Sequence, residues 1–231
     1  MTVSEALQEL AGDYRWRASR AAELLTASGG AAVPGLCELL RTGSVRARWR
    51  AATVLGQIGD PAAVPALEEA LDDRHALVRE RSAEALLALG ATGVLARAAE
   101  TGSVEVRRRA VLTLRRLSEP VAIRALARAI EDRDVVVRCQ AAAGLAELAR
   151  TAPTLALRLA LPPLTARAEY WLTGRAERRE MAKAARAIER ATQSLHDLPV
   201  PAAADRSGDA LPIPAVPPRD CSDLPRVSDG G

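Results

Sequence analysis

The stretch VRERSAEALLALG, residues 78–90, decides the fold, because most of residues 1–150 repeat its pattern. Counted from Val78 as the origin, apolar residues stand five, eight and eleven places on, at Ala83, Leu86 and Leu89. This spacing places them on one face of a helix. Four further segments keep these offsets, and neighbouring origins are 31, 31, 28 and 31 residues apart. Their origins are Trp16, Ala47, Val106 and Val137.

A second apolar pattern precedes most of these origins. Before Ala47, for example, Val33, Leu36 and Leu40 stand fourteen, eleven and seven places upstream. Each repeat is therefore a predicted helical hairpin that cannot bury its apolar face alone, so neighbouring copies must stack. The sequence predicts an all-α fold, an α-solenoid of about five hairpins, with repeats over 1–150. The predicted hairpins span 4–29, 33–59, 62–90, 92–118 and 121–150.

The repeat pattern fails after Arg150, and we expect an irregular sixth unit and a capping helix over 151–198. A helical segment that begins near Thr154 is expected to stop at Pro162-Pro163. A longer amphipathic helix is predicted from about Arg175 to His196, sealing the last repeat. Its apolar face would carry Met181, Ala185, Ile188, Thr192 and Leu195, and the segment before it replaces the usual apolar residues by Tyr170, Trp171 and Leu172.

The composition changes in the last segment, residues 199–231. This segment holds seven of the 14 prolines and few large apolar side chains. Such a segment cannot bury enough surface to offset the entropy of ordering. We therefore predict a Pro-rich disordered tail.

The segment AATVLGQIGDPAAVPAL, residues 51–67, closely resembles the consensus of HEAT repeats, in particular the short bacterial type called PBS-lyase HEAT-like repeats. The resemblance covers about residues 1–150. It implies the fold more specifically than the function, because the family includes adaptors, bilin-lyase subunits and domains attached to enzymes.

Arginine recurs one place after every origin. A cation in the first turn of a helix opposes the helix macrodipole, so its recurrence needs another cause. In HEAT-like repeats this arginine forms a ladder with an aspartate of the hairpin turn, and the resemblance implies the same role for Asp73 and Asp132, while Thr42, Thr101 and Ala11 occupy the other turn sites. We therefore expect a partial structural ladder. Its arginines are Arg17, Arg48, Arg79, Arg107 and Arg138.

A different side of each second helix points away from the core, at offsets two, three, six, nine and ten. In the family that the chain resembles, this side lines a concave groove. A basic groove suits an acidic peptide or a phosphate backbone, and a solvated helix face without a ligand is the alternative. The candidate partner-binding residues are Trp49, Arg50, Glu80, Arg81, Glu84, Arg108, Arg109, Arg115 and Arg116.

Catalysis and cofactors find little support in the sequence. Its two histidines, His75 and His196, and its three separated cysteines predict neither a metal site nor a nucleophile paired with a base. The net charge of only +3 does not favour nucleic acid, and no signal peptide or membrane segment is expected. We therefore expect a cytoplasmic, monomeric and non-enzymatic scaffold without cofactor or metal, which binds an acidic protein or peptide.

Two alternatives stay open. The repeat subtype also fits a bilin-lyase-like subunit that handles a chromophore. A HEAT-like DNA-binding protein or DNA glycosylase would use Trp49, Glu80, Glu84 and the arginines, although such enzymes have more than one aromatic residue in the groove.

Overall fold

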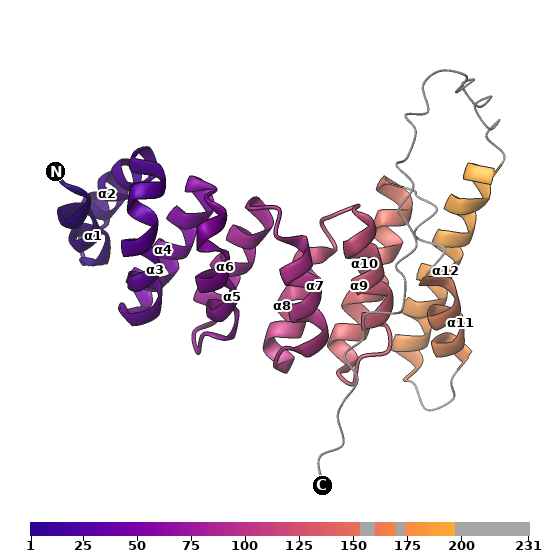
Figure 1. Ribbon diagram of the computed structural model, residues 1–231. Coiled ribbons are helices and arrows are strands. Elements are labelled where there is room, and N and C mark those ends of the chain that lie inside the picture. Colours follow the sequence, from indigo (N-terminus) through magenta and orange to yellow (C-terminus); the bar gives the residue numbers. More distant parts are fainter. Residues whose placement is uncertain (153–159, 170–173, 197–231) are drawn as a thin grey trace, which may run out of the picture. The chain divides into compact units, whose positions relative to one another are not determined.

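The computed structural model describes residues 1–152, 160–169 and 174–196. These residues form helices joined by short turns, without a strand. They are arranged as hairpins that stack side by side in sequence order (Figure 1). The first hairpin pairs α1 (Val3–Ala11) with α2 (Arg15–Ser28), and the second pairs α3 (Val33–Thr42) with α4 (Val45–Ile58).

The next three hairpins follow the same plan. Their helices are α5 (Val64–Glu69) and α6 (Ala76–Ala88), α7 (Thr92–Thr101) and α8 (Val104–Leu114), and α9 (Pro120–Ala129) and α10 (Val135–Thr151). Short 3₁₀ turns at Gly29–Ala32, Pro61–Ala63 and Ala70–Asp72 flank the first helices of the second and third hairpins. The structure confirms the predicted α-solenoid of helical hairpins.

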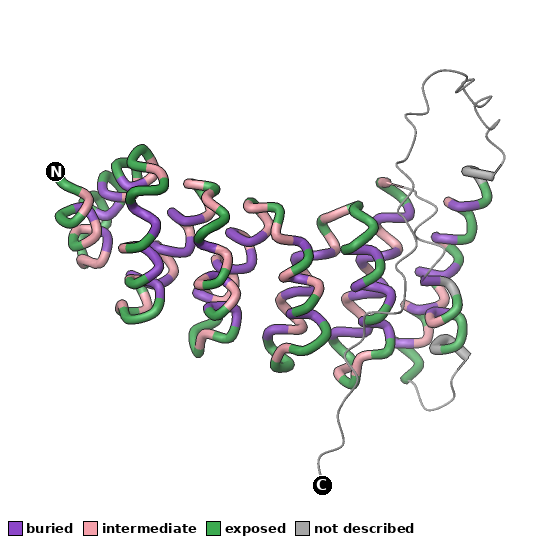
Figure 2. The backbone as a smooth tube through the Cα atoms, in the orientation of Figure 1, coloured by how far each residue is buried: buried purple, intermediate pink, exposed green. Residues whose placement is uncertain are grey.

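The core runs along the stack between the two layers of helices (Figure 2). In α4 the buried apolar residues are Ala47, Ala51, Ala52, Val54 and Leu55, and α6, α8 and α10 bury the equivalent positions. The predicted offsets of zero, five and eight are therefore correct in these four helices. Their neighbours at four and seven are also buried, which widens the apolar stripe.

The prediction for the first hairpin is wrong by about one residue. Trp16 and Leu24, predicted to face the core, are 64% and 36% exposed, whereas Ala18, Ala21 and Leu25 are buried. A shift of one residue rotates a helical pattern by about 100°. The N-cap of α2 is Tyr14. If the origin lies as far from the N-cap as it does in the other second helices, the origin of α2 is the residue after Trp16.

Close backbone contact holds successive second helices in one layer. A Cβ atom on Gly56 of α4 would lie 2.9 Å from the Cα atom of Ala85 in α6. A Cβ atom on Gly144 of α10 would lie 2.6 Å from the Cβ atom of Arg115, just after α8. Only glycine fits at these two crossings, since carbon atoms in van der Waals contact are about 3.5–4 Å apart.

A sixth hairpin ends the described part of the chain. It pairs α11 (Leu161–Glu169) with α12 (Arg175–His196), and α12 packs on α10 as well as on α11. This confirms the predicted capping helix. Met181, Ala185, Ile188 and Thr192 of α12 are buried, as predicted.

Pro162 and Pro163 correct the prediction that they stop a helix. They lie in the first turn of α11 and therefore begin one. Proline is tolerated there, because the first backbone N–H groups of a helix have no partner within it. The predictions for the start near Thr154, for Tyr170 to Leu172 and for the tail at 199–231 lie outside the described residues, and the structure does not describe the burial of Leu195.

Candidate partner-binding surface

All nine candidate partner-binding residues lie on the outward sides of α4, α6 and α8 or directly after α8, and we call this surface the second-helix face. Trp49 and Arg50 belong to α4, the three candidates between Glu80 and Glu84 belong to α6, and the remaining four belong to α8 or the two residues that follow it. All of them are half-buried except Arg116, which is exposed. Their side chains differ in what they already bind.

Arg50 closes the end of the first helix. Its Nη1 atom donates hydrogen bonds to the carbonyl oxygens of Leu10 at 2.9 Å and Gly12 at 2.7 Å. Its guanidinium group also lies 5.6 Å from the ring centroid of Trp49. Because the last carbonyl groups of a helix lack partners within the helix, Arg50 has a structural role in holding α1 against α4.

Arg108 is hydrogen-bonded to two acidic side chains. It donates two hydrogen bonds to the carboxylate of Asp134, at 3.0 and 2.7 Å, and one to Glu105 at 3.1 Å. The hydrogen bonds from Arg108 are the main reason that the pKa of Asp134 falls to about 2. Asp134 also caps α10, since its side chain accepts hydrogen bonds from the N–H groups of Val136 and Val137.

Two further arginines of the second-helix face have acidic partners. Arg81 forms an ion pair with Glu84 at 2.7 Å within α6. Arg109 of α8 reaches back to Glu80 of α6, with 3.7 Å between nitrogen and oxygen. The charges at the centre of the predicted patch are therefore largely balanced.

Arg115 and Arg116 are different. Within the described residues, neither guanidinium group has a hydrogen-bond or ion-pair partner. Arg115 packs its Cβ atom against Gly144 of α10. Both residues stand at the C-terminal end of α8, where the helix dipole stabilises a positive charge. They are the uncompensated cations of the second-helix face.

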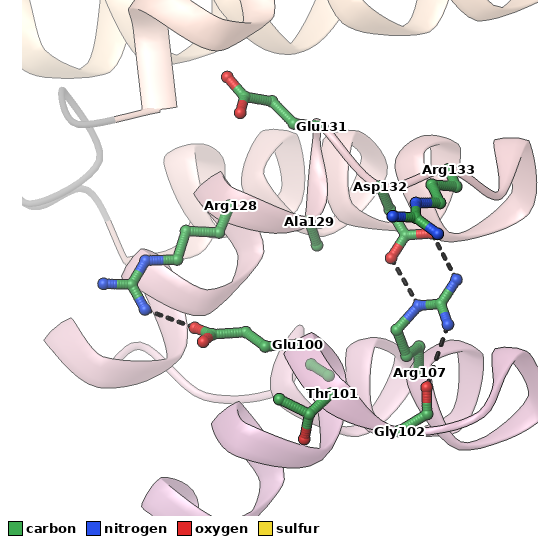
Figure 3. Close-up of a pocket in the computed structure, with 10 residues that line it drawn as sticks. Glu100, Thr101, Gly102, Arg107, Arg128, Ala129, Glu131, Asp132 and Arg133 are labelled. Atoms are coloured by element: carbon green, nitrogen blue, oxygen red, sulfur yellow. Dashed lines mark hydrogen bonds and ion pairs between the residues drawn. The ribbon is translucent and has the colours of Figure 1, made fainter.

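The predicted ladder residues Arg48 and Arg107 connect successive repeats. Arg48 donates to the carboxylate of Asp73 at 2.7 and 3.0 Å and to the carbonyl oxygen of Gly43 at 2.9 Å. Arg107 makes the same set of bonds, to the carboxylate of Asp132 and the carbonyl oxygen of Gly102 (Figure 3). In each case the acid belongs to the repeat that follows the arginine.

Each ladder aspartate also binds the arginine of its own repeat, through its backbone. The carbonyl oxygen of Asp73 accepts a hydrogen bond from Arg79 at 2.8 Å, and that of Asp132 accepts one from Arg138 at 2.8 Å. One aspartate thus joins two arginines, one through its carboxylate and one through its carbonyl group. This geometry explains why an Asp in the turn and an Arg six residues later recur together.

Arg17 and Arg79 find other acids, because Thr42 and Thr101 stand where the next repeat would supply an aspartate. The carboxylate that Arg79 reaches is Glu105, at 3.6 Å. Arg17 departs from the ladder: it pairs with Glu9 of its own hairpin at 3.3 Å and its side chain is 46% exposed.

Arg138 ends the ladder at the capping helix. Its side chain donates two hydrogen bonds to the carboxylate of Glu177 in the first turn of α12, at 2.5 and 2.9 Å. Both side chains are at most 10% exposed. Glu177 lies outside the repeats, so the repeat pattern does not predict it. The glutamate nevertheless supplies the acid that the turn of a following repeat would otherwise provide.

A hollow of about 490 Å³ lies beside the Arg107 and Asp132 pair (Figure 3). Arg128 and Glu100 close its other side with an ion pair of 2.5 Å between α9 and α7. Because these two ion pairs each join successive repeats, the hollow is part of the contact between repeats.

The ladder predicts that stability falls in acid. Burial alone would raise the pKa of Asp73 and Asp132, but hydrogen bonds from Arg48 or Arg107 and from a backbone N–H outweigh it, so both pKa values lie below the ordinary value. A lowered pKa in the folded state stabilises the fold above the unfolded value, about 3.9, and this contribution is lost as the pH falls through the folded pKa. We expect the urea midpoint to fall steadily from pH 5 to pH 2. The fall should be smaller in Asp134→Asn, because this variant lacks another carboxylate whose pKa is lowered in the folded state. A midpoint constant over this range would contradict the prediction.

The described residues contain neither a metal-binding cluster nor a membrane-spanning helix. No group of three or more His, Cys, Asp or Glu side chains in them could hold a metal ion. Among the described helices, none is long and apolar enough to span a membrane.

Known proteins bear out the repeat architecture. The family model for HEAT repeats matches residues 3–87. No curated protein matches the sequence. A chain from a structural study of microtubule plus end tracking by XMAP215, CLIP-170 and EB1 is similar to this chain with a TM-score of 0.52 and 16% identity, covering 82% of this chain and 89% of that one.

Two other solved structures are less similar to this chain. A designed armadillo repeat protein in complex with the peptide (KR)4 has a TM-score of 0.48 and 18% identity, covering 81% of this chain and 100% of that one. The complex of CpcE and CpcF of phycocyanin lyase from Nostoc sp. PCC7120 has a TM-score of 0.33 and 20% identity, covering 81% and 95%. The match to the HEAT-repeat model over residues 3–87 and the TM-score of 0.52 agree with the α-solenoid fold of the chain.

Proposed function

We propose that this HEAT-repeat chain is a non-enzymatic scaffold that binds an acidic segment of a partner protein on its second-helix face. The observation that carries the proposal is the pair Arg115 and Arg116. Within the described residues, no acid neutralises these two neighbouring cations on a face where Arg81, Arg108 and Arg109 all have acidic partners. Free guanidinium groups bind carboxylates through paired, charge-assisted hydrogen bonds.

The pairing within the chain narrows the predicted Arg-rich patch. Arg108 would have to give up Asp134, and Arg50 would have to give up two helix carbonyls, before either could bind a partner. Each of these arginines would lose internal hydrogen bonds before it gained bonds to a partner, which reduces the net gain from binding. The acidic segment therefore binds at the end of α8, and the paired arginines hold that surface in shape.

A titration with a labelled peptide tests the proposal. A peptide of ten glutamates with a fluorescein label should bind the chain in low salt, as measured by fluorescence anisotropy. Arg115→Glu/Arg116→Glu should weaken binding at least tenfold, which corresponds to about 1.4 kcal/mol. Binding should also weaken as salt is added, because salt screens exposed charges.

The matched control is Arg74→Glu/Arg124→Glu, which changes the net charge equally. Both of these arginines are exposed, one in the turn before α6 and the other on α9. This variant should bind the peptide within about twofold of the unaltered chain. Equal losses in the two variants would show that only net charge matters and would remove the proposed site.

A further inference from the structure

A second hollow opens where the solenoid begins. Between α2 and α4 lies a cleft of about 500 Å³. Its apolar lining includes Leu10, Ala18 and Val54, which are buried, and the half-buried Trp49 forms part of its wall. The residues of α2 that line the cleft include the small Ala18, Ser19 and Ala22. Its volume lies within the range of about 300–1,000 Å³ that is typical of ligand sites.

The charged rim of the cleft is mainly basic. Arg46 forms an ion pair with Asp13 at 3.0 Å, and Arg50 lies over the Trp49 ring while it binds the end of α1. The third rim cation, Arg15, is exposed and has no acidic partner among the described residues. An apolar pocket with an uncompensated cation at its rim favours an apolar side chain with a carboxylate beside it.

We propose that this cleft receives a large apolar side chain, such as leucine or phenylalanine, from the acidic partner segment, with a flanking carboxylate at Arg15. The inference rests on the proposed function, because it adds an anchor to the acidic segment that binds Arg115 and Arg116. Trp and Arg, together with Tyr, are enriched among the residues that dominate binding energy at protein interfaces.

General helix geometry sets the length of the segment. Packed helices lie about 8–10 Å apart, so the cleft before α4 and the arginines after α8 are separated by about two and a half such steps. Trp49 and Arg116 stand two and ten places after the origins of their repeats, so they also differ by about 12 Å along the helix direction, at about 1.5 Å per residue. The combined separation of roughly 25 Å requires about seven or eight extended residues.

Labelled peptides of this length test the inference. Each carries one leucine between two aspartates, a spacer of eight glycine and serine residues, and four glutamates, and both chain directions are made. In at least one direction, the leucine peptide should bind at least tenfold more tightly than the same peptide with serine in place of leucine. A ratio near one in both directions would overturn the inference.

Variants in the cleft locate the anchor. Ala22→Leu fills the cleft and leaves Trp49 in place, and Trp49→Ala removes its wall. Both should reduce the ratio of leucine to serine affinity to below about threefold, and circular dichroism melts show whether they remain folded. A ratio that stays tenfold in folded Ala22→Leu would place the leucine elsewhere. Tight binding of a ten-nucleotide oligothymidylate that Ala22→Leu abolishes would also overturn the proposed occupant.

The same experiment separates this inference from the proposed function. Arg115→Glu/Arg116→Glu should weaken the leucine and serine peptides equally and leave their ratio at tenfold or more. If the two charge reversals change neither affinity while the ratio persists, the acidic site after α8 is wrong and the anchor cleft stands. If the reversals weaken both peptides but the ratio of leucine to serine affinity is one, the acidic site after α8 stands and the anchor cleft is wrong.

Discussion

Replacing Glu177 with alanine is expected to lower the free energy of unfolding by about 3–5 kcal/mol. The carboxylate of Glu177 binds the guanidinium group of Arg138 through two short hydrogen bonds, and Arg138 is 8% exposed. Without Glu177 the guanidinium group keeps only its bonds to backbone carbonyls, so a buried charge loses its counter-ion. Urea denaturation followed by circular dichroism measures the loss.

Glu180→Ala is the control for this variant. Glu180 lies one turn further along α12 and its contact with Lys183 is 4.0 Å long, with side chains that are 43% and 73% exposed. Exposed ion pairs contribute about 0–1 kcal/mol, so this variant should unfold almost as the unaltered chain does. Equal losses for the two glutamates would mean that α12 is not held by the buried pair with Arg138.

Asp73→Ala is expected to have an effect of similar size, about 3–5 kcal/mol. Its carboxylate is the acidic partner of Arg48, whose side chain is 6% exposed. The substitution leaves Arg48 with the carbonyl oxygen of Gly43 and loosens the contact between the second and third hairpins. The measurement is again the free energy of unfolding in urea.

Two comparisons identify the cause of that loss. The neighbouring Asp72 is exposed and accepts a hydrogen bond from Ser103, so Asp72→Ala should cost about 1 kcal/mol or less. Arg48→Met/Asp73→Ala removes the buried cation together with its partner, and it should be more stable than Asp73→Ala. If the double variant is less stable than the single one, the loss does not come from an unpaired charge.

Much of the fold follows from the spacing of apolar residues. The apolar offsets of α4, α6, α8 and α10 predict their buried faces, because each of these helices packs on a copy of itself. The first hairpin follows the pattern less well, since the turn before α2 shifts its register and leaves Trp16 exposed. Predictions from a repeat fail where the connecting turn differs.

The candidate site was less predictable than the fold. The periodicity places Arg50, Arg108 and Arg115 on one type of surface, but it does not reveal which of them bind within the chain. The bonds that decide this cross between repeats, as from Arg108 to Asp134, or join distant helices, as from Arg50 to the end of α1. Such contacts depend on three-dimensional packing. One signal was present in the sequence: Asp134 stands at a helix start, where a capping acid is common.

The most direct test of the account is to titrate the labelled glutamate peptide into Asp73→Ala and Arg115→Glu/Arg116→Glu at a temperature at which both are folded. We expect Asp73→Ala to bind like the unaltered chain despite its lower stability, and the double charge reversal to bind at least tenfold more weakly at unchanged stability. The division between arginines that hold repeats together and arginines that bind a partner would be contradicted if the double reversal bound the peptide with unchanged affinity.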